Sequence, residues 1–388
     1  MYLPFAIFLL TDIFYFYVLR KRKISITNVF PFIFVGFVNL YTLACYLANI
    51  LGFASRYKIE LLASESIISQ YLYNSSIALF IFSLCILFSK MKYNKADDNY
   101  EFEANKLFYY ICFFIVYPFA YYFAGLANWT TGERSGLVPS LAAYTRNIIT
   151  VLVITFISMK NLSNTKKFLF MLLYLVITFK STQRTNFLIV AVAYVYTIKN
   201  TKVATRMLVF SVIALLALGS LRNGISVLNI MYPIMGEGIF GSWGTLNAIE
   251  QIQKYGFDST NILYILNPIL NFFIEKIGFY LPQVSDVLSS HGIVYYPLGG
   301  FFYISDAILA HPYIGTPIYT FFIYLLYKLG YKMYIRKATA ESLLYLGLLF
   351  EVIKATLTVT TAMFLFHFLF LFLFRLFSKM IYRACKTL

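Results

Sequence analysis

Residues 168–198 read FLFMLLYLVITF-KSTQRTN-FLIVAVAYVYTI. Two apolar runs, Phe168–Phe179 and Phe187–Ile198, flank a polar turn that carries Arg184. Each run covers about 18 Å as an α-helix, whereas the hydrocarbon core of a bilayer is roughly 30 Å thick. We therefore expect two short membrane helices whose polar turn is drawn into the membrane edge or into a wet cavity. Ionisable groups at that depth are costly, which makes Arg184 a candidate for function.

The composition of the whole chain agrees with a membrane protein. It is 60% hydrophobic and only 12% charged, and its mean hydropathy is +0.73. Soluble domains average roughly 45–50% apolar and about 25% charged residues, so a large soluble protein is excluded. We predict an all-α polytopic integral membrane protein with about 11 transmembrane helices. The expected helices are Tyr2–Leu19, Asn28–Leu51, Ile67–Ser89, Leu107–Ala127, Pro139–Met159, Phe168–Phe179, Phe187–Ile198, Met207–Gly219, Pro317–Tyr331, Leu343–Leu357 and Met363–Met380.

The distribution of charge predicts the orientation of these helices. The net charge is +16, and most basic residues fall in loops on one side, such as Arg20–Lys23, Lys160–Lys167 and Lys328–Lys337. This is the positive-inside pattern, which makes that side cytoplasmic and places the N-terminus outside and the C-terminus in the cytoplasm. The excess charge reflects topology, so no nucleic-acid partner is expected. The first helix has no charged region before it and no cleavage site after it, which predicts a retained helix.

One long segment differs from the plain membrane helices. Residues 220–315 combine carboxylates, glycines and Trp243, and we expect them to form one large external loop that contains interfacial helices. Ser242 is a candidate cap for a helix that ends at Tyr255. Gly299–Ala310 is a second interfacial candidate. The predicted organisation is a helical bundle over 1–219, the loop over 220–315 and further helices over 316–388.

Several kinds of catalytic site have no sequence signature here. The chain has no GxxxxGK[ST] loop, no HExxH and no GxSxG. The four cysteines are scattered, with no CxxC spacing, and none of the three histidines has metal-ligand spacing. We expect no metal and no cofactor. His367 lies in a continuous apolar helix and is expected to be a hydrogen-bonded structural residue.

Arginines near the outer ends of the predicted helices are the main binding candidates. A guanidinium keeps its charge at any working pH, and its fork fits phosphate oxygens. Several guanidinium groups that converge on one cavity would suit a diphosphate-linked lipid. The alternative for each is an interfacial anchor or a partner of a nearby carboxylate. These residues are Arg134, Arg146, Arg184 and Arg222.

Two residues of the loop are candidates for proton transfer. His291 lies in a Ser-Ser-His-Gly context, where an exposed histidine can act as a general base near neutral pH. Glu237 lies in a glycine-rich setting and can act as a base or a sugar ligand, although an ordinary loop turn explains it equally well. Asp306 has a similar status.

The layout resembles the O-antigen or capsular repeat-unit polymerases, the Wzy family. The resemblance rests on the polar turn with Arg184, on Leu221-Arg222-Asn223 at the start of the large loop, and on the glycine-rich return from Gly299 through Asp306 to Pro312–Gly315. Such proteins have about eleven to fourteen membrane helices and a large external loop in the last third of the chain.

The resemblance implies a function at the outer leaflet of the bacterial inner (cytoplasmic) membrane. The substrate would be an oligosaccharide repeat unit on undecaprenyl diphosphate, and the chain would transfer the growing glycan to a new lipid-linked unit. Arg184 and Arg222 would hold the diphosphate and stabilise its charge as it leaves. His291 or Glu237 would accept the proton of the attacking hydroxyl. A chain-length regulator and a flippase are possible partners.

Two other functions remain open on sequence. An O-antigen ligase shares the donor and differs in the acceptor. A lipid-linked oligosaccharide flippase or transporter often has inverted repeats with broken helices, and no such symmetry is visible here. A purely structural membrane subunit would not need arginines beside short helices.

Overall fold

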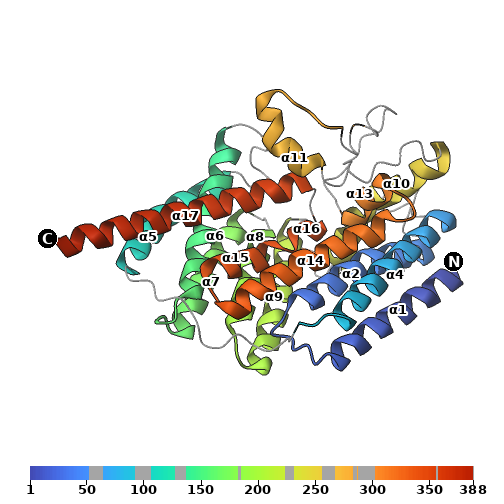
Figure 1. Cartoon of the computed structure of the whole chain (residues 1–388), viewed down its shortest axis with the longest axis horizontal. Coiled ribbons are helices and arrows are strands. Elements are labelled where there is room, and N and C mark those ends of the chain that lie inside the picture. The colour runs from blue at the N-terminus through green and yellow to red at the C-terminus, as the bar shows by residue number, and fades with distance from the viewer. Residues whose placement is uncertain are drawn as a thin grey trace. The chain divides into compact units, whose positions relative to one another are not determined.

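The computed structural model is helical throughout the part of the chain that it describes (Figure 1). It describes residues 1–51, 64–91, 106–126, 137–181, 185–222, 231–255, 267–282, 286, 302–354 and 357–387. The elements are α1 (Tyr2–Lys21), α2 (Phe30–Ile50), α4 (Glu65–Leu87), α5 (Lys106–Leu126), α6 (Leu137–Ser158), α7 (Asn164–Ser181), α8 (Thr185–Thr197), α9 (Thr201–Arg222), α10 (Met231–Tyr255), α11 (Asn267–Ile274), η4 (Glu275–Ile277), α13 (Tyr303–Ala310), α14 (Gly315–Arg336), α15 (Ala340–Leu348), α16 (Glu351–Lys354) and α17 (Leu357–Thr387).

Within these residues, 6 helices are long and apolar enough to cross a membrane: α1, α2, α4, α5, and most of α6 and α17. All six coincide with helices expected from the sequence to within a few residues at most ends, although α17 extends farther at both ends. The chain is therefore a helical protein of the membrane type. The further helices expected to cross, including α8 and α14, do not meet the same combination of length and hydropathy.

The helices group into two compact units. Unit 1 contains Met1–Tyr93, Met231–Lys328 and Leu349–Ala362, and unit 2 contains Asn94–Ile230, Leu329–Leu348 and Met363–Leu388. Each unit therefore combines segments that are far apart in the sequence.

Aromatic side chains form the core of unit 1. Phe34 of α2 stacks on Phe82 of α4 with ring centroids 4.1 Å apart, and Phe30 stacks on Tyr327 of α14 at 5.1 Å. Tyr15 of α1 packs against Phe82 and donates a hydrogen bond to the Pro31 carbonyl at 2.8 Å. These contacts join α1, α2, α4 and the first part of α14, and the first three helices run side by side in Figure 1.

Helix α10 packs against α2 through small residues. A Cβ at Gly238 would lie 2.6 Å from the Leu40 carbonyl oxygen, so only glycine allows this approach. One turn later, the Ser242 hydroxyl bonds to the Tyr41 carbonyl at 3.0 Å and accepts from the Tyr71 hydroxyl at 2.9 Å. Small residues four apart, with a hydroxyl bonded across the contact, are typical of membrane helix pairs. The expectation that Ser242 caps a helix is wrong, because Ser242 lies in the middle of α10 and α10 packs into the core of unit 1.

Helix α8 is the central element of unit 2. It has 13 residues, nearly all buried, and it contacts α6, α7, α9 and α15. A Cβ at Gly347 of α15 would lie 2.7 Å from the Ile189 carbonyl oxygen, so the two helices touch through backbone. The sequence predicted this short helix correctly. Met207–Gly219, in contrast, is part of the 22-residue α9, so the prediction of a short helix there is wrong.

The predicted helix Leu343–Leu357 is also wrong, because the structure divides it into α15 and α16. At the break, the backbone amides of Val352 and Ile353 bond to carbonyls three residues earlier, at 3.2 and 3.0 Å. This is the tighter 3₁₀ pattern. The break places the carboxylate of Glu351 in the first turn of α16, where negative charge is favourable.

Candidate functional site

Polar side chains from three helices of unit 2 meet at the start of α8. Asn186, one residue after the start of α8, donates from Nδ2 to Oδ1 of Asn147 on α6 at 3.4 Å. The hydroxyls of Thr150 on α6 and Tyr174 on α7 lie 2.7 Å apart. Thr150 and Tyr174 are fully buried and Asn186 is almost so. These contacts hold α7 and the start of α8 beside the middle of α6.

The level at which α8 begins follows from its contact with Asn147. Asn147 lies ten residues after Leu137, the first residue of α6, which is about 15 Å at 1.5 Å per residue. The start of α8 therefore lies level with the middle of α6. Helix α7 has 18 residues, Asn164–Ser181, so the prediction of a short helix over Phe168–Phe179 is wrong.

Arg146 adjoins this polar cluster. Its side chain is half-buried, and its Nε is buried without a hydrogen-bond partner in the described part of the chain. Its guanidinium lies within electrostatic range of the Tyr174 phenol and the His367 ring. Among the described residues, no carboxylate forms an ion pair with it. A cation at this depth without a counter-charge is costly unless a ligand supplies one.

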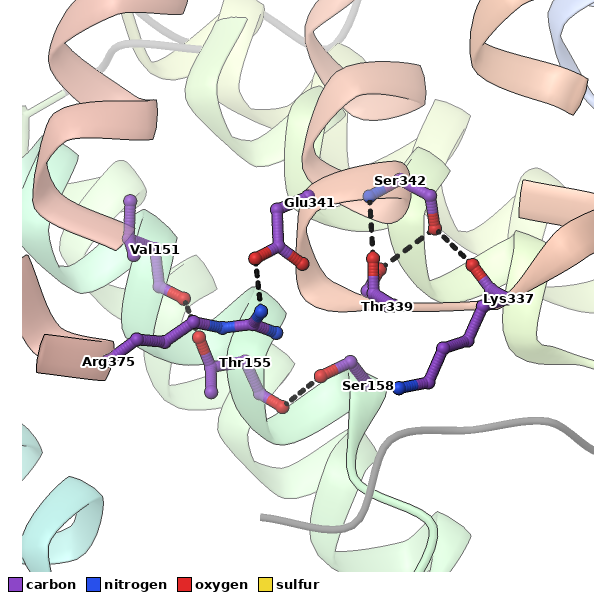
Figure 2. Close-up of polar contacts among 8 residues, drawn as sticks. All are labelled: Val151, Thr155, Ser158, Lys337, Thr339, Glu341, Ser342 and Arg375. Atoms are coloured by element: carbon purple, nitrogen blue, oxygen red, sulfur yellow. Dashed lines mark hydrogen bonds and ion pairs between the residues drawn. The ribbon is translucent and has the colours of Figure 1, made fainter. Parts of the chain in front are cut away.

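A second arginine of unit 2 shows the contrasting arrangement. Arg375 of α17 forms an ion pair with Glu341 in the first turn of α15 (Figure 2). Beside it, Thr339 caps α15 by accepting the Ser342 backbone amide at 3.3 Å, and the Ser342 hydroxyl donates to the Thr339 carbonyl at 2.9 Å. Arg375 is thus a structural arginine with its own carboxylate, whereas Arg146 has none in the described part of the chain.

His367 of α17 is the other polar side chain near Arg146. It is fully buried, and its Nδ1 lies 2.7 Å from the Met363 carbonyl oxygen one turn earlier. A carbonyl only accepts, so Nδ1 carries the proton and Nε2 carries a lone pair. Nε2 is buried and has no hydrogen-bond partner among the described residues. The expectation of a hydrogen-bonded structural histidine therefore describes only one of the two ring nitrogens.

The other predicted site residues are only partly visible. Arg134, Arg184 and His291 lie outside the described residues. Arg222 is the last residue of α9 and Glu237 lies in α10, but the described part does not include their side chains. Arg222 and Glu237 belong to different units. Asp306 is buried in α13, a helix that packs against α10. The structure therefore brings together Arg146 and the backbone on either side of Arg184.

One polar pair was missed by the sequence reasoning. Asp12, in the middle of α1, accepts a hydrogen bond from Nδ2 of Asn39 on α2 at 2.9 Å. The sequence contained the information needed to find it, because Asp12 is a single carboxylate within the otherwise apolar run of α1. The pair lies in unit 1 and joins α1 to α2 at membrane depth.

The cluster in unit 2 has the chemistry of an anion site. It offers the cation of Arg146, the amides and hydroxyls of Asn147, Asn186 and Tyr174, and the amino end of α8, whose free backbone amides favour negative charge. The described residues contain no group of three or more His, Cys, Asp or Glu side chains that is arranged to hold a metal ion.

Comparison of the chain with protein-family models, curated proteins and solved structures finds no match. The functional argument therefore rests on the residues of this cluster.

Proposed function

We propose that this protein is a membrane glycosyltransferase that polymerises undecaprenyl-diphosphate-linked repeat units into a surface polysaccharide. In this proposal about eleven helices cross the bacterial inner membrane, and the reaction takes place at its outer leaflet. The observation that carries the proposal is the half-buried Arg146, which has no counter-charge among the described residues and is followed by Asn147, the partner of Asn186 at the start of α8. A diphosphate would supply the missing negative charge.

The proposed transfer uses the diphosphate as the leaving group. The acceptor hydroxyl forms a bond to the anomeric carbon of the donor sugar, and the bond from that carbon to the diphosphate oxygen breaks. The diphosphate leaves with the electron pair. Arg146, Arg184 and Arg222 and the amino end of α8 stabilise the developing charge, and Arg134 lies on the approach. His291 or Glu237 takes the hydroxyl proton.

The test is glycan length in a strain that lacks the gene and carries either the wild-type protein or Arg146→Lys. Lysine keeps the charge but loses the guanidinium fork, so we expect only single-repeat glycan at equal protein level. Arg375→Lys is the matched control, because it makes the same exchange at the arginine that pairs with Glu341. We expect it to keep the wild-type ladder.

Other outcomes separate the rival functions. A wild-type ladder with Arg146→Lys at equal protein level would remove Arg146 from the site. Loss of all surface glycan in the deletion strain, with single units trapped inside, would identify a flippase. Accumulation of long lipid-linked polymer without transfer would identify a ligase.

A further inference from the structure

The buried imidazole of His367 presents a hydrogen-bond acceptor that no described residue uses. Its Nδ1 proton is committed to the Met363 carbonyl, which leaves the lone pair of Nε2. A buried polar atom without a partner costs roughly the free energy of one hydrogen bond, so a native protein rarely keeps one without a reason. A ligand that carries a hydrogen-bond donor would satisfy this nitrogen.

The neighbourhood of Arg146 limits what that donor can be. Tyr144 of α6 packs edge-on against Phe366 of α17 with ring centroids 5.9 Å apart, which places this part of α17 beside the turn of α6 that carries Arg146. The Nδ1 proton of His367 is donated to the Met363 carbonyl, so Nε2 is the acceptor of the ring. The pair therefore presents one cation and one acceptor.

This combination fits an anion that has a hydroxyl beside it. An ionised diphosphate offers only acceptor oxygens, which satisfy Arg146 but repel the lone pair of Nε2. A sugar joined to that diphosphate adds hydroxyl donors a few ångströms from the phosphate. A sugar diphosphate therefore matches both groups, whereas a bare lipid diphosphate matches only one.

We propose that Nε2 of His367 accepts a hydrogen bond from a hydroxyl of the sugar that is attached directly to the lipid diphosphate. The inference rests on the proposed function, because it places that diphosphate at Arg146. His367 then distinguishes the sugar-bearing donor from the spent carrier. After transfer, the bare lipid diphosphate loses this hydrogen bond and is released more readily.

The test compares two ligands on the purified full-length protein in lipid nanodiscs. The probes are undecaprenyl diphosphate and the same lipid carrying one repeat unit, purified from the deletion strain. We expect His367→Phe to weaken binding of the sugar-bearing lipid about tenfold, which corresponds to the loss of one hydrogen bond, and to leave binding of the bare lipid unchanged. His367→Gln should keep most of the difference, because its amide oxygen can accept a hydrogen bond near the position of Nε2. His367→Met is a second apolar variant in case the phenylalanine does not fit.

The failure of this inference is distinct from failure of the proposed function. Equal weakening of both ligands by His367→Phe and His367→Met would mean a structural role and would overturn the inference, as would no change with either ligand. Arg146→Ala tests the proposed function separately, because it should weaken both ligands. If Arg146→Ala changed neither affinity, the diphosphate would not lie at Arg146 and the basis of the inference would be lost.

Discussion

The guanidinium of Arg146 lies about 13 Å along α6 from Leu137, among Tyr174, His367 and the apolar interior of unit 2. Insertion of an arginine at the centre of a membrane helix costs roughly 2.5–3.5 kcal/mol. No described carboxylate offsets this cost. The proposed function therefore predicts that Arg146 destabilises the protein when no diphosphate is bound.

The cost of burying the Arg146 charge predicts that Arg146→Leu stabilises the protein while abolishing glycan polymerisation. We expect a gain of about 1–3 kcal/mol in the free energy of unfolding, because a well-packed apolar residue replaces an unpaired buried charge. The measurement is the thermal unfolding midpoint of the purified protein in detergent. Arg375→Leu is the control and should lower the midpoint, because it leaves Glu341 unpaired. A lower midpoint for Arg146→Leu than for wild type would contradict the prediction.

At the residue level, the sequence named Arg146 only as one of four outward arginines, and the rule that a charge at membrane depth needs an explanation was applied to Arg184. The same rule applied to Asp12 would have identified the pair that it forms with Asn39. His367 could not be interpreted in this way. Whether its Nε2 has a partner depends on α6 and on other segments distant in the sequence, and a single helix pattern does not contain that information.

Among the elements, the contact between α10 and α2 depends on a glycine. We predict that Gly238→Ala lowers the free energy of unfolding by about 1–3 kcal/mol, because the added methyl group would overlap the Leu40 carbonyl and force the helices apart. The thermal midpoint in detergent measures this loss.

Gly36→Ala on α2 is the matched control for this change. A Cβ at Gly36 meets nothing within 4 Å, so its midpoint should stay the same or rise through better helix propensity. Equal midpoints for the two variants would show that the close approach of α10 to α2 does not contribute to stability.

Most membrane helices were predictable because they are local patterns. The run of apolar residues sets α1, α2, α4, α5 and α6, and their ends follow from flanking charges. The break between α15 and α16 was not predictable, because Leu343–Leu357 is apolar apart from Glu351 and Lys354 and contains no proline. The position of α10 was also missed, since Gly238 and Ser242 acquire meaning only against Tyr41 and Tyr71.

For the whole molecule, the charge distribution predicts an outside N-terminus and a cytoplasmic C-terminus. We expect green fluorescent protein to fluoresce when fused to the C-terminus in a bacterial host. Alkaline phosphatase should be active when fused after Leu126 and inactive when fused after Ser163. Activity only after Ser163, with a dark C-terminal fusion, would reverse the orientation and place the proposed chemistry on the wrong leaflet.

The two units explain why domain boundaries were hard to predict. Unit 2 takes α15 and most of α17 from the C-terminal third of the chain and joins them to α5–α9. A division by sequence into 1–219, 220–315 and 316–388 describes membrane topology, which the contacts between helices do not test. The packing contacts divide the same helices into the two units instead.

The central position of α8 also has a consequence for the order in which the protein is made. Its surface is covered in part by α15, which leaves the ribosome long after α8. At roughly 5–20 residues per second of synthesis, that delay is on the order of 10 seconds. During this interval α8, whose 13 residues are fewer than the roughly 20 of a typical membrane-spanning helix, lacks one of its neighbours. The surroundings of α8 are therefore completed only after α15 has been made, and a chain that stops before Ala340 lacks the α15 contact.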